Sequence, residues 1–167
     1  MKYKIIKEQL MYLKKRQAFT MIELVFVIVV IGILSAIAIP KLAATRDDAV
    51  ITKAISTLSA VRSSLATERQ KRILRGDFTP LTSLGGTAGT LFDYYNGDVN
   101  ESAVLEYPIS PCATGARGCW VKTSNTVYTY KMPHNSSDVA FTLDPAKFRL
   151  DCVRTGSTGA DCIELTR

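Results

Sequence analysis

The chain has 167 residues, of which 47% are hydrophobic and 22% charged, enough for one modest domain and a membrane segment. Its net charge of +6 is concentrated at the N-terminus, where residues 1–18 hold six Lys or Arg side chains and one Glu. The remaining residues carry 15 basic and 14 acidic side chains. A basic cluster before an apolar segment holds that end of a chain in the cytoplasm, so the charge does not indicate nucleic-acid binding.

An apolar segment runs from Phe19 to Pro40, directly after a basic cluster at residues 14–16. As a helix it would span roughly 33 Å, against a hydrocarbon core of ~30 Å, and we expect one transmembrane pass. Glu23 is its only ionisable side chain. A charge inside a membrane costs about 2.5–3.5 kcal/mol at the centre and normally has a partner. The sequence therefore predicts a specific role for Glu23.

A conventional secretory signal peptide is the alternative for this region. Residues 24–34 would form its hydrophobic part and residues 36–38, Ala-Ile-Ala, its cleavage site. The chain would then be a secreted or membrane-anchored, disulfide-stabilised binding domain. Pro40 just past that site, Glu23 within the apolar part and the helical pattern downstream all argue against it.

The string Phe-Thr-Met-Ile-Glu-Leu at residues 19–24 resembles the processing site of type IV prepilins and the related type II secretion pseudopilins. The resemblance implies that residues 1–18 are a leader, which prepilin peptidase removes by cutting between Ala18 and Phe19 before methylating the new N-terminus, Phe19. The family normally has Gly where this chain has Ala18. Translation from a second methionine, Met11, would give a leader of eight residues, and both starts stay open.

Glu23 lies where the family carries its glutamate, five residues into the mature chain. The free α-amino group of Phe19 would be cationic, since its reference pKa is about 8, and pairing with it offsets the cost of burying a carboxylate. Because the amine can belong to an adjacent subunit, we expect Glu23 to set the register of assembly. Gly32 and Pro40 fall where many members carry helix-loosening residues, although an ordinary membrane helix explains them as well.

Residues 41–75 continue the helical pattern and are expected to form an amphipathic helix that covers a core. Its apolar residues recur at three- and four-residue steps: Ile51, Ala54, Ile55, Leu58, Val61 and Leu65. Four basic residues precede the expected stop at Gly76: Arg69, Lys71, Arg72 and Arg75. They complement the helix dipole, and since no aromatic residues interleave with them, we do not expect nucleic-acid binding.

Residues 76–167 are expected to form a globular, β-rich head. Strand signals occur at residues 126–131 and 139–143, and residues 148–153 and 162–165 read as a terminal hairpin. The predicted fold class is α+β: a long N-terminal helix, transmembrane in its first half, packed on a small antiparallel sheet. This is also the pilin fold that the resemblance implies.

Four cysteines lie downstream of the apolar segment: Cys112, Cys119, Cys152 and Cys162. An even number on the exported side predicts disulfides in an oxidising compartment such as the periplasm. Three connectivities are possible, and the pairing of neighbours would close two short loops, each worth roughly 2.5 kcal/mol. Many pilins carry one disulfide near the C-terminus, which the resemblance implies for the second pair.

Metal binding and catalysis find little support. Five oxygen-bearing residues cluster in the head (Asp93, Asn96, Asp98, Asn100 and Glu101), but they lack the ligand spacing of an EF-hand, and a turn at Asn96-Gly97 explains them. The only histidine is His134, and no nucleophile or phosphate loop is recognisable. We expect no enzyme, cofactor or metal site.

The sequence as a whole predicts a pilin-like structural subunit, processed, N-methylated and anchored by a single pass in the bacterial inner membrane with its head in the periplasm. Expected partners are prepilin peptidase, an inner-membrane assembly platform, membrane lipid before assembly, and copies of itself or sibling subunits. A type II secretion pseudopilus and a type IV pilus or competence filament are both compatible. Because subunits that initiate a pseudopilus tip often lack the glutamate, the resemblance implies a position in the filament body for a chain with Glu23.

Overall fold

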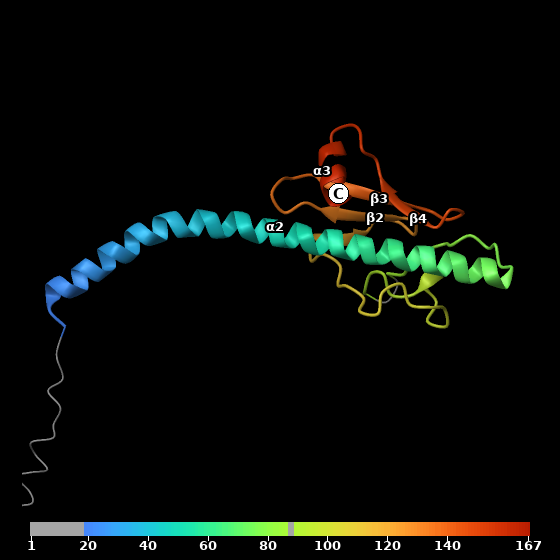
Figure 1. Cartoon of the computed structure of the whole chain (residues 1–167), viewed down its shortest axis with the longest axis horizontal. Coiled ribbons are helices and arrows are strands. Elements are labelled where there is room, and N and C mark those ends of the chain that lie inside the picture. The colour runs from blue at the N-terminus through green and yellow to red at the C-terminus, as the bar shows by residue number, and fades with distance from the viewer. Residues whose placement is uncertain (1–18, 87–88) are drawn as a thin grey trace, which may run out of the picture. The chain divides into compact units, whose positions relative to one another are not determined.

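The computed structural model describes residues 19–86 and 89–167, and the predicted leader, including Ala18 at the cut, lies outside them. The chain divides into two compact units between Ala43 and Ala44. Its elements in chain order (Figure 1) are α2 (Met21–Arg75), the 3-10 turn η1 (Tyr95–Gly97), β1 (Cys119–Lys122), β2 (Val127–Lys131), β3 (Asp138–Asp144), β4 (Arg149–Cys152) and α3 (Gly159–Leu165).

The first unit holds the apolar part of α2. Its stretch Met21–Ile39 has a mean hydropathy of 3.0, none of it is buried, and by length and composition it is able to cross a membrane. Thr20 caps the helix, since its hydroxyl accepts a hydrogen bond from the Glu23 N–H at 3.3 Å. Thr and Glu three residues apart are the sequence signature of a capping box, which explains why α2 begins here.

Gly32 and Pro40 do not interrupt α2, which is continuous across both. A Cβ atom added to Gly32 would meet no atom within 4 Å, so no packing inside the described chain requires glycine there. The loosening of the helix at these two positions stays a prediction about the subunit after it leaves the bilayer.

In the second unit, α2 covers the core with the predicted stripe. Ile51, Ala54, Leu58, Val61 and Leu65 are all buried, and Ile55 is partly buried against the same core. The same face continues with Glu68 and Arg72, whose charges are buried as well. The helix ends at Arg75, and Gly76 adopts a positive φ of 72°, the C-terminal conformation that glycine favours.

The sheet has four antiparallel strands in the order β1-β2-β3-β4. Alternation places Tyr128 and Tyr130 of β2 and Phe141 of β3 in the core, as their sequence pattern predicts. Trp120 of β1 joins them, with ring centroids 5.1 Å from Tyr130 and 5.2 Å from Phe141. β1 itself was not among the predicted strands, because it is four residues long and follows a loop-rich stretch.

The terminal hairpin predicted at residues 148–165 is wrong in its second half. β4 is present, but the return segment is the short helix α3. Its buried residues, Gly159, Cys162 and Leu165, recur every three residues, which is a helical spacing. Gly159 is required by packing, since an added Cβ would lie 2.6 Å from the Arg154 carbonyl oxygen.

Candidate functional site

The N-terminal candidate site is the first turn of α2 with the residue that precedes it. Phe19, the predicted first residue of the mature chain, is 79% exposed. The Glu23 side chain is exposed in the first turn, and its carboxylate makes no hydrogen bond or ion pair with any residue from 19 to 86 or from 89 to 167. The positive end of the helix dipole favours a carboxylate at this place, but it does not neutralise the charge.

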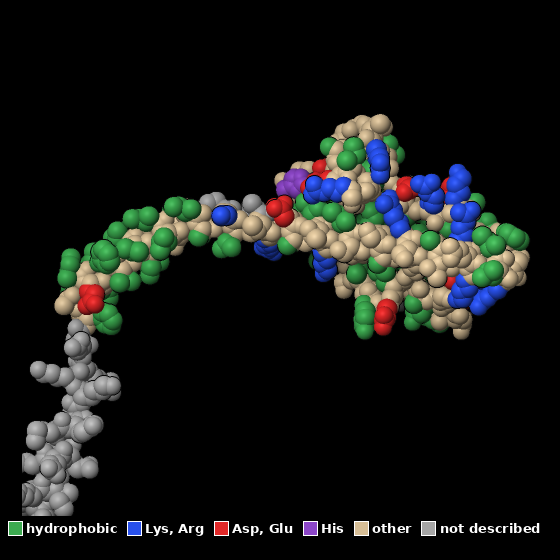
Figure 2. Space-filling view, viewed as in Figure 1, with side chains coloured by type: hydrophobic (Ala, Val, Ile, Leu, Met, Phe, Trp, Pro, Cys, Tyr) green, Lys and Arg blue, Asp and Glu red, His purple; other side chains and the backbone are tan. Residues whose placement is uncertain are grey.

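Apolar side chains surround Glu23. Ile22, Val25, Phe26 and Val29 border the same shallow surface, and all four are exposed. Figure 2 shows hydrophobic side chains covering this stretch of α2. A continuous exposed apolar surface of this kind marks contact with a membrane or with other proteins. One carboxylate within it is the feature that a cationic partner would recognise.

In the head, the predicted basic cluster separates into residues with different roles. Arg72 is buried, and its guanidinium lies 2.9 Å from Glu68 and 3.3 Å from Glu101. It also lies over the ring of Phe148, 5.7 Å from the centroid. Arg72 therefore ties α2 to the loop at Glu101 and to the segment before β4. The interpretation of the whole cluster as dipole-complementing surface charge missed this role.

Two buried tyrosines also join α2 to the rest of the head. The hydroxyls of Tyr95 and Ser64 lie 2.6 Å apart, and the Tyr130 hydroxyl donates to the Val50 carbonyl at 3.3 Å. Burial raises the pKa of both tyrosines to about 12. The head is thus held on α2 by buried polar contacts in addition to the apolar stripe, and the sequence pattern did not identify these contacts.

The disulfides have the local pairing. Cys112 bonds Cys119 at the first residue of β1, and Cys152 bonds Cys162. The second disulfide joins the end of β4 to α3, where the predicted hairpin would have placed a strand. Both cross-links belong to the head and connect segments ten or fewer residues apart in sequence.

The five oxygen-bearing residues considered for calcium organise the loop after α2. Buried Asp93 accepts hydrogen bonds from the Gly86 and Tyr94 N–H groups at 2.9 and 2.8 Å. Asn96 accepts one from the Thr82 N–H at 2.8 Å, and both Asn96 and Gly97 have positive φ, as a tight turn requires. Protein donors thus contact the side-chain oxygens of Asp93 and Asn96, and Asn96-Gly97 forms the predicted tight turn.

A second group, which the sequence did not reveal, lies at α3. His134, Asp161 and Glu164 place possible ligand atoms within 4.8 Å of one another. Asp161, however, already accepts hydrogen bonds from the Ser137 hydroxyl and from the Asn135 side chain. The group therefore links the β2–β3 connection to α3.

The comparison with protein families agrees with the N-terminal geometry. Residues 13–39 match the model of the prokaryotic N-terminal methylation motif, which is characteristic of type IV prepilins and pseudopilins. The matched residues include Ala18, Phe19, Glu23 and Gly32. The match covers 27 of the 167 residues, so it shows the motif that proteins of the pilin or pseudopilin type carry at the N-terminus, and it does not extend to the head. No solved structure matches the chain.

Proposed function

We propose that this chain is a subunit of a helical filament, cut by prepilin peptidase between Ala18 and Phe19 and methylated on Phe19. The N-terminal methylation motif supports this proposal, as does the apolar stretch Met21–Ile39. The observation that carries it is the Glu23 carboxylate, which is exposed on an apolar surface and has no partner among residues 19–86 and 89–167.

Before assembly, the apolar part of α2 anchors the subunit in the inner membrane, and the head lies in the periplasm. A helix satisfies its own backbone hydrogen bonds in lipid, so the span needs no other protein there. When an assembly platform lifts the subunit out of the bilayer, the exposed apolar side chains of α2 must find other cover. Copies of the same helix, or those of sibling subunits, provide it in the filament.

Processing creates the partner of Glu23. The cut releases an α-amino group at Phe19, which is cationic near neutral pH. In a staggered stack of helices, the amine of one subunit lies beside Glu23 of the next, and only that register pairs both buried charges. A misplaced subunit would leave an unpaired charge in an apolar interior, at a cost of several kcal/mol.

The test replaces Glu23 with Gln and with Ala. Gln preserves the capping-box chemistry at the start of α2 but removes the charge, whereas Ala removes both. We expect both variants to be cleaved and inserted, and both to give much less sheared filament than the wild type. Wild-type yield for Glu23→Gln would show that Glu23 serves the helix start and not the charge pair.

The mature N-terminus separates this proposal from the conventional signal peptide. Prepilin processing leaves Phe19 as the first residue, and signal peptidase would leave Ile39, a difference of 20 residues. Mass spectrometry of the purified chain distinguishes the two and also detects N-methylation. Deletion of the gene would then assign the filament system, through loss of protein secretion for a pseudopilus or loss of surface filaments for a pilus.

A further inference from the structure

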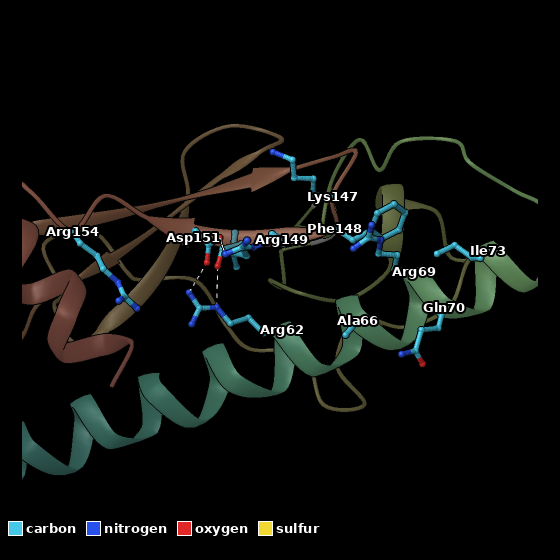
Figure 3. Close-up of a pocket in the computed structure, with 11 residues that line it drawn as sticks. Arg62, Ala66, Arg69, Gln70, Ile73, Lys147, Phe148, Arg149, Asp151 and Arg154 are labelled. Carbon is cyan, nitrogen blue, oxygen red and sulfur yellow. Dashed lines mark hydrogen bonds and ion pairs between the residues drawn. The ribbon is translucent and has the colours of Figure 1, made fainter.

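A basic groove lies between the second part of α2 and β4 in the head. Its volume is about 520 Å³, and we call it the β4 groove. Figure 3 shows Arg62 and Arg69 of α2 on one side and Phe148, Arg149 and Asp151 on the other. Two more cations, from Lys147 and Arg154, line it, and the sides of Ala66, Ile73 and Leu150 make part of its surface apolar.

The cations of the β4 groove outnumber its carboxylates. Asp151 is the single acidic residue of the lining, and it is shared by Arg62 at 3.0 Å and Arg149 at 2.8 Å. The side chain of Arg69 is exposed and makes no hydrogen bond or ion pair with the described residues. Because an Arg guanidinium binds a carboxylate through two parallel hydrogen bonds, the groove is suited to an acidic side chain.

The same chain exposes an acidic and aromatic projection elsewhere on the head. Tyr107 is 80% exposed, and the adjacent Glu106 is an exposed carboxylate with no ion pair to any described residue. Tyr107 and the next residues, Pro108 and Ile109, border a hollow together with Trp120 of β1. We call residues 106–107 the β1-side projection.

The groove and the projection lie at opposite edges of the sheet. β1 and β4 are its two outer strands, and the loop that carries the projection lies on the other side of α2 from β4 (Figure 1). One head therefore does not fill its own groove with its own projection. A contact between unlike surfaces of identical copies is a head-to-tail contact, and it builds an open helical chain when the rotation between copies does not close a ring.

We propose that the Glu106–Tyr107 projection of one copy docks in the β4 groove of the next copy. The carboxylate of Glu106 pairs with Arg69, and the Tyr107 ring packs on the apolar part of the groove, where guanidinium groups also favour an aromatic face. The proposal rests on the proposed function as a filament subunit and gives it a lateral contact between heads. A bare polyanion would match the cations of the groove but not its apolar side.

The first test places a photoreactive residue, p-benzoylphenylalanine, at position 107 of the full chain in filament-producing cells. This aromatic replacement leaves the four disulfide cysteines untouched. After irradiation, we expect a covalent dimer whose cross-linked peptides come from residues 62–73 or 147–154. The same residue at exposed position 78, in place of Phe78, serves as the control and should give no covalent dimer through the groove. Adducts that map elsewhere, or only to other proteins, would overturn the docking.

The second test reverses charges. Glu106→Arg and Arg69→Glu should each lower the yield of sheared filament about fivefold, which is the upper end of the effect of one exposed ion pair. The double variant restores the opposite charges, so it should regain most of the wild-type yield. The matched control combines Arg69→Glu with Asp48→Arg, a charge reversal at an exposed acidic residue of α2 outside the projection. This combination should not restore the yield of sheared filament. Restoration by Asp48→Arg would assign a different acidic partner and contradict the proposal.

These outcomes separate the docking from the proposed function. If the chain is no filament subunit, wild-type cells give neither sheared polymer nor a photo-dimer. If wild-type filaments form and Tyr107 fails to mark the groove, only the docking is wrong. Arg69-dependent binding of an oligonucleotide by the detergent-solubilised full chain, without a photo-dimer, would identify the groove as a polyanion site instead.

Discussion

Replacing Arg72 by Met tests how far the head depends on one buried guanidinium. The side chains of Arg72 and Glu68 are both only 6% exposed, and they lie 2.9 Å apart. Removal of one partner from a buried ion pair costs about 3–5 kcal/mol, because the other charge is stranded. Lys71 stays 3.6 Å from Glu68, so we expect the lower end of this range, about 3 kcal/mol, in Arg72→Met.

The double variant Arg72→Met with Glu68→Gln separates the pair from the packing. It leaves no buried charge at positions 68 and 72, so the loss of unfolding free energy should fall to about 1–2 kcal/mol. This remainder is the cost of losing the Arg72 contacts with Glu101 and Phe148. Arg69→Met is the control on the same helix. Arg69 is exposed and makes no ion pair with the described residues, and its replacement should change stability by less than about 0.5 kcal/mol.

Urea unfolding of the full chain in detergent measures these differences. The fluorescence of Trp120 reports on the head alone, because it is the only tryptophan and it is buried among aromatic rings. A shift of the midpoint at constant slope reads as a change in stability. A loss below 1 kcal/mol for Arg72→Met, or losses that add in the double variant, would refute the account of Arg72 as a buried anchor.

Two further predictions concern the head. In the unfolded chain Tyr95 and Tyr130 ionise near pH 10, whereas burial raises the pKa of both to about 12, so the stability they contribute is complete below pH 10 and is lost between pH 10 and 12. The urea midpoint should fall over that range, and replacing both by Phe should flatten the fall. Reduction of Cys152–Cys162 should raise hydrogen exchange in α3 before exchange rises in the buried stripe of α2. Equal loss of protection in both helices would contradict this.

The parts of the fold that the sequence predicts are those with local periodicity. Leu58, Val61 and Leu65 repeat at helical steps, and Tyr128 and Tyr130 alternate as a strand does, so each pattern specifies both the element and its buried face. The motif around Phe19 and Glu23 is equally local. For this reason the family-model match at residues 13–39 agrees with the sequence analysis.

The missed elements are short and depend on their neighbours. Residues 162–165 hold three apolar side chains and one Glu, and this stretch is too brief to distinguish a strand from a helix. The helix forms because Cys162 and Leu165 meet the core together. β1 has only four residues, and its partners in β2, such as Tyr130 opposite Trp120, define it. Pairing across the sheet is not visible in a single short segment.

The buried charges of α2 had a signal that was available. Glu68 follows Leu65 by three residues and Arg72 follows Glu68 by four, so both continue the apolar stripe. Opposite charges on the core face of a helix indicate a buried ion pair, whereas charges on the solvent face do not. The sequence does not show the other contacts of Arg72. Glu101 is 29 residues from Arg72 along the chain, and Phe148 contacts Arg72 from a backbone conformation with a positive φ of 55°.

The distribution of partners among charged groups connects these observations with filament assembly. Inside the head, buried Glu68, Arg72 and Asp93 all find partners within the chain, as a stable core requires. Glu23 and Arg69 make no ion pair with the described residues, although each lies beside apolar surface. Within residues 19–86 and 89–167, folding therefore leaves both charges without an ion-pair partner. We propose that other copies of the chain bring the missing groups, the amine of Phe19 for Glu23 and the carboxylate of Glu106 for Arg69, so that each proposed contact pairs a charge and covers an apolar surface at once.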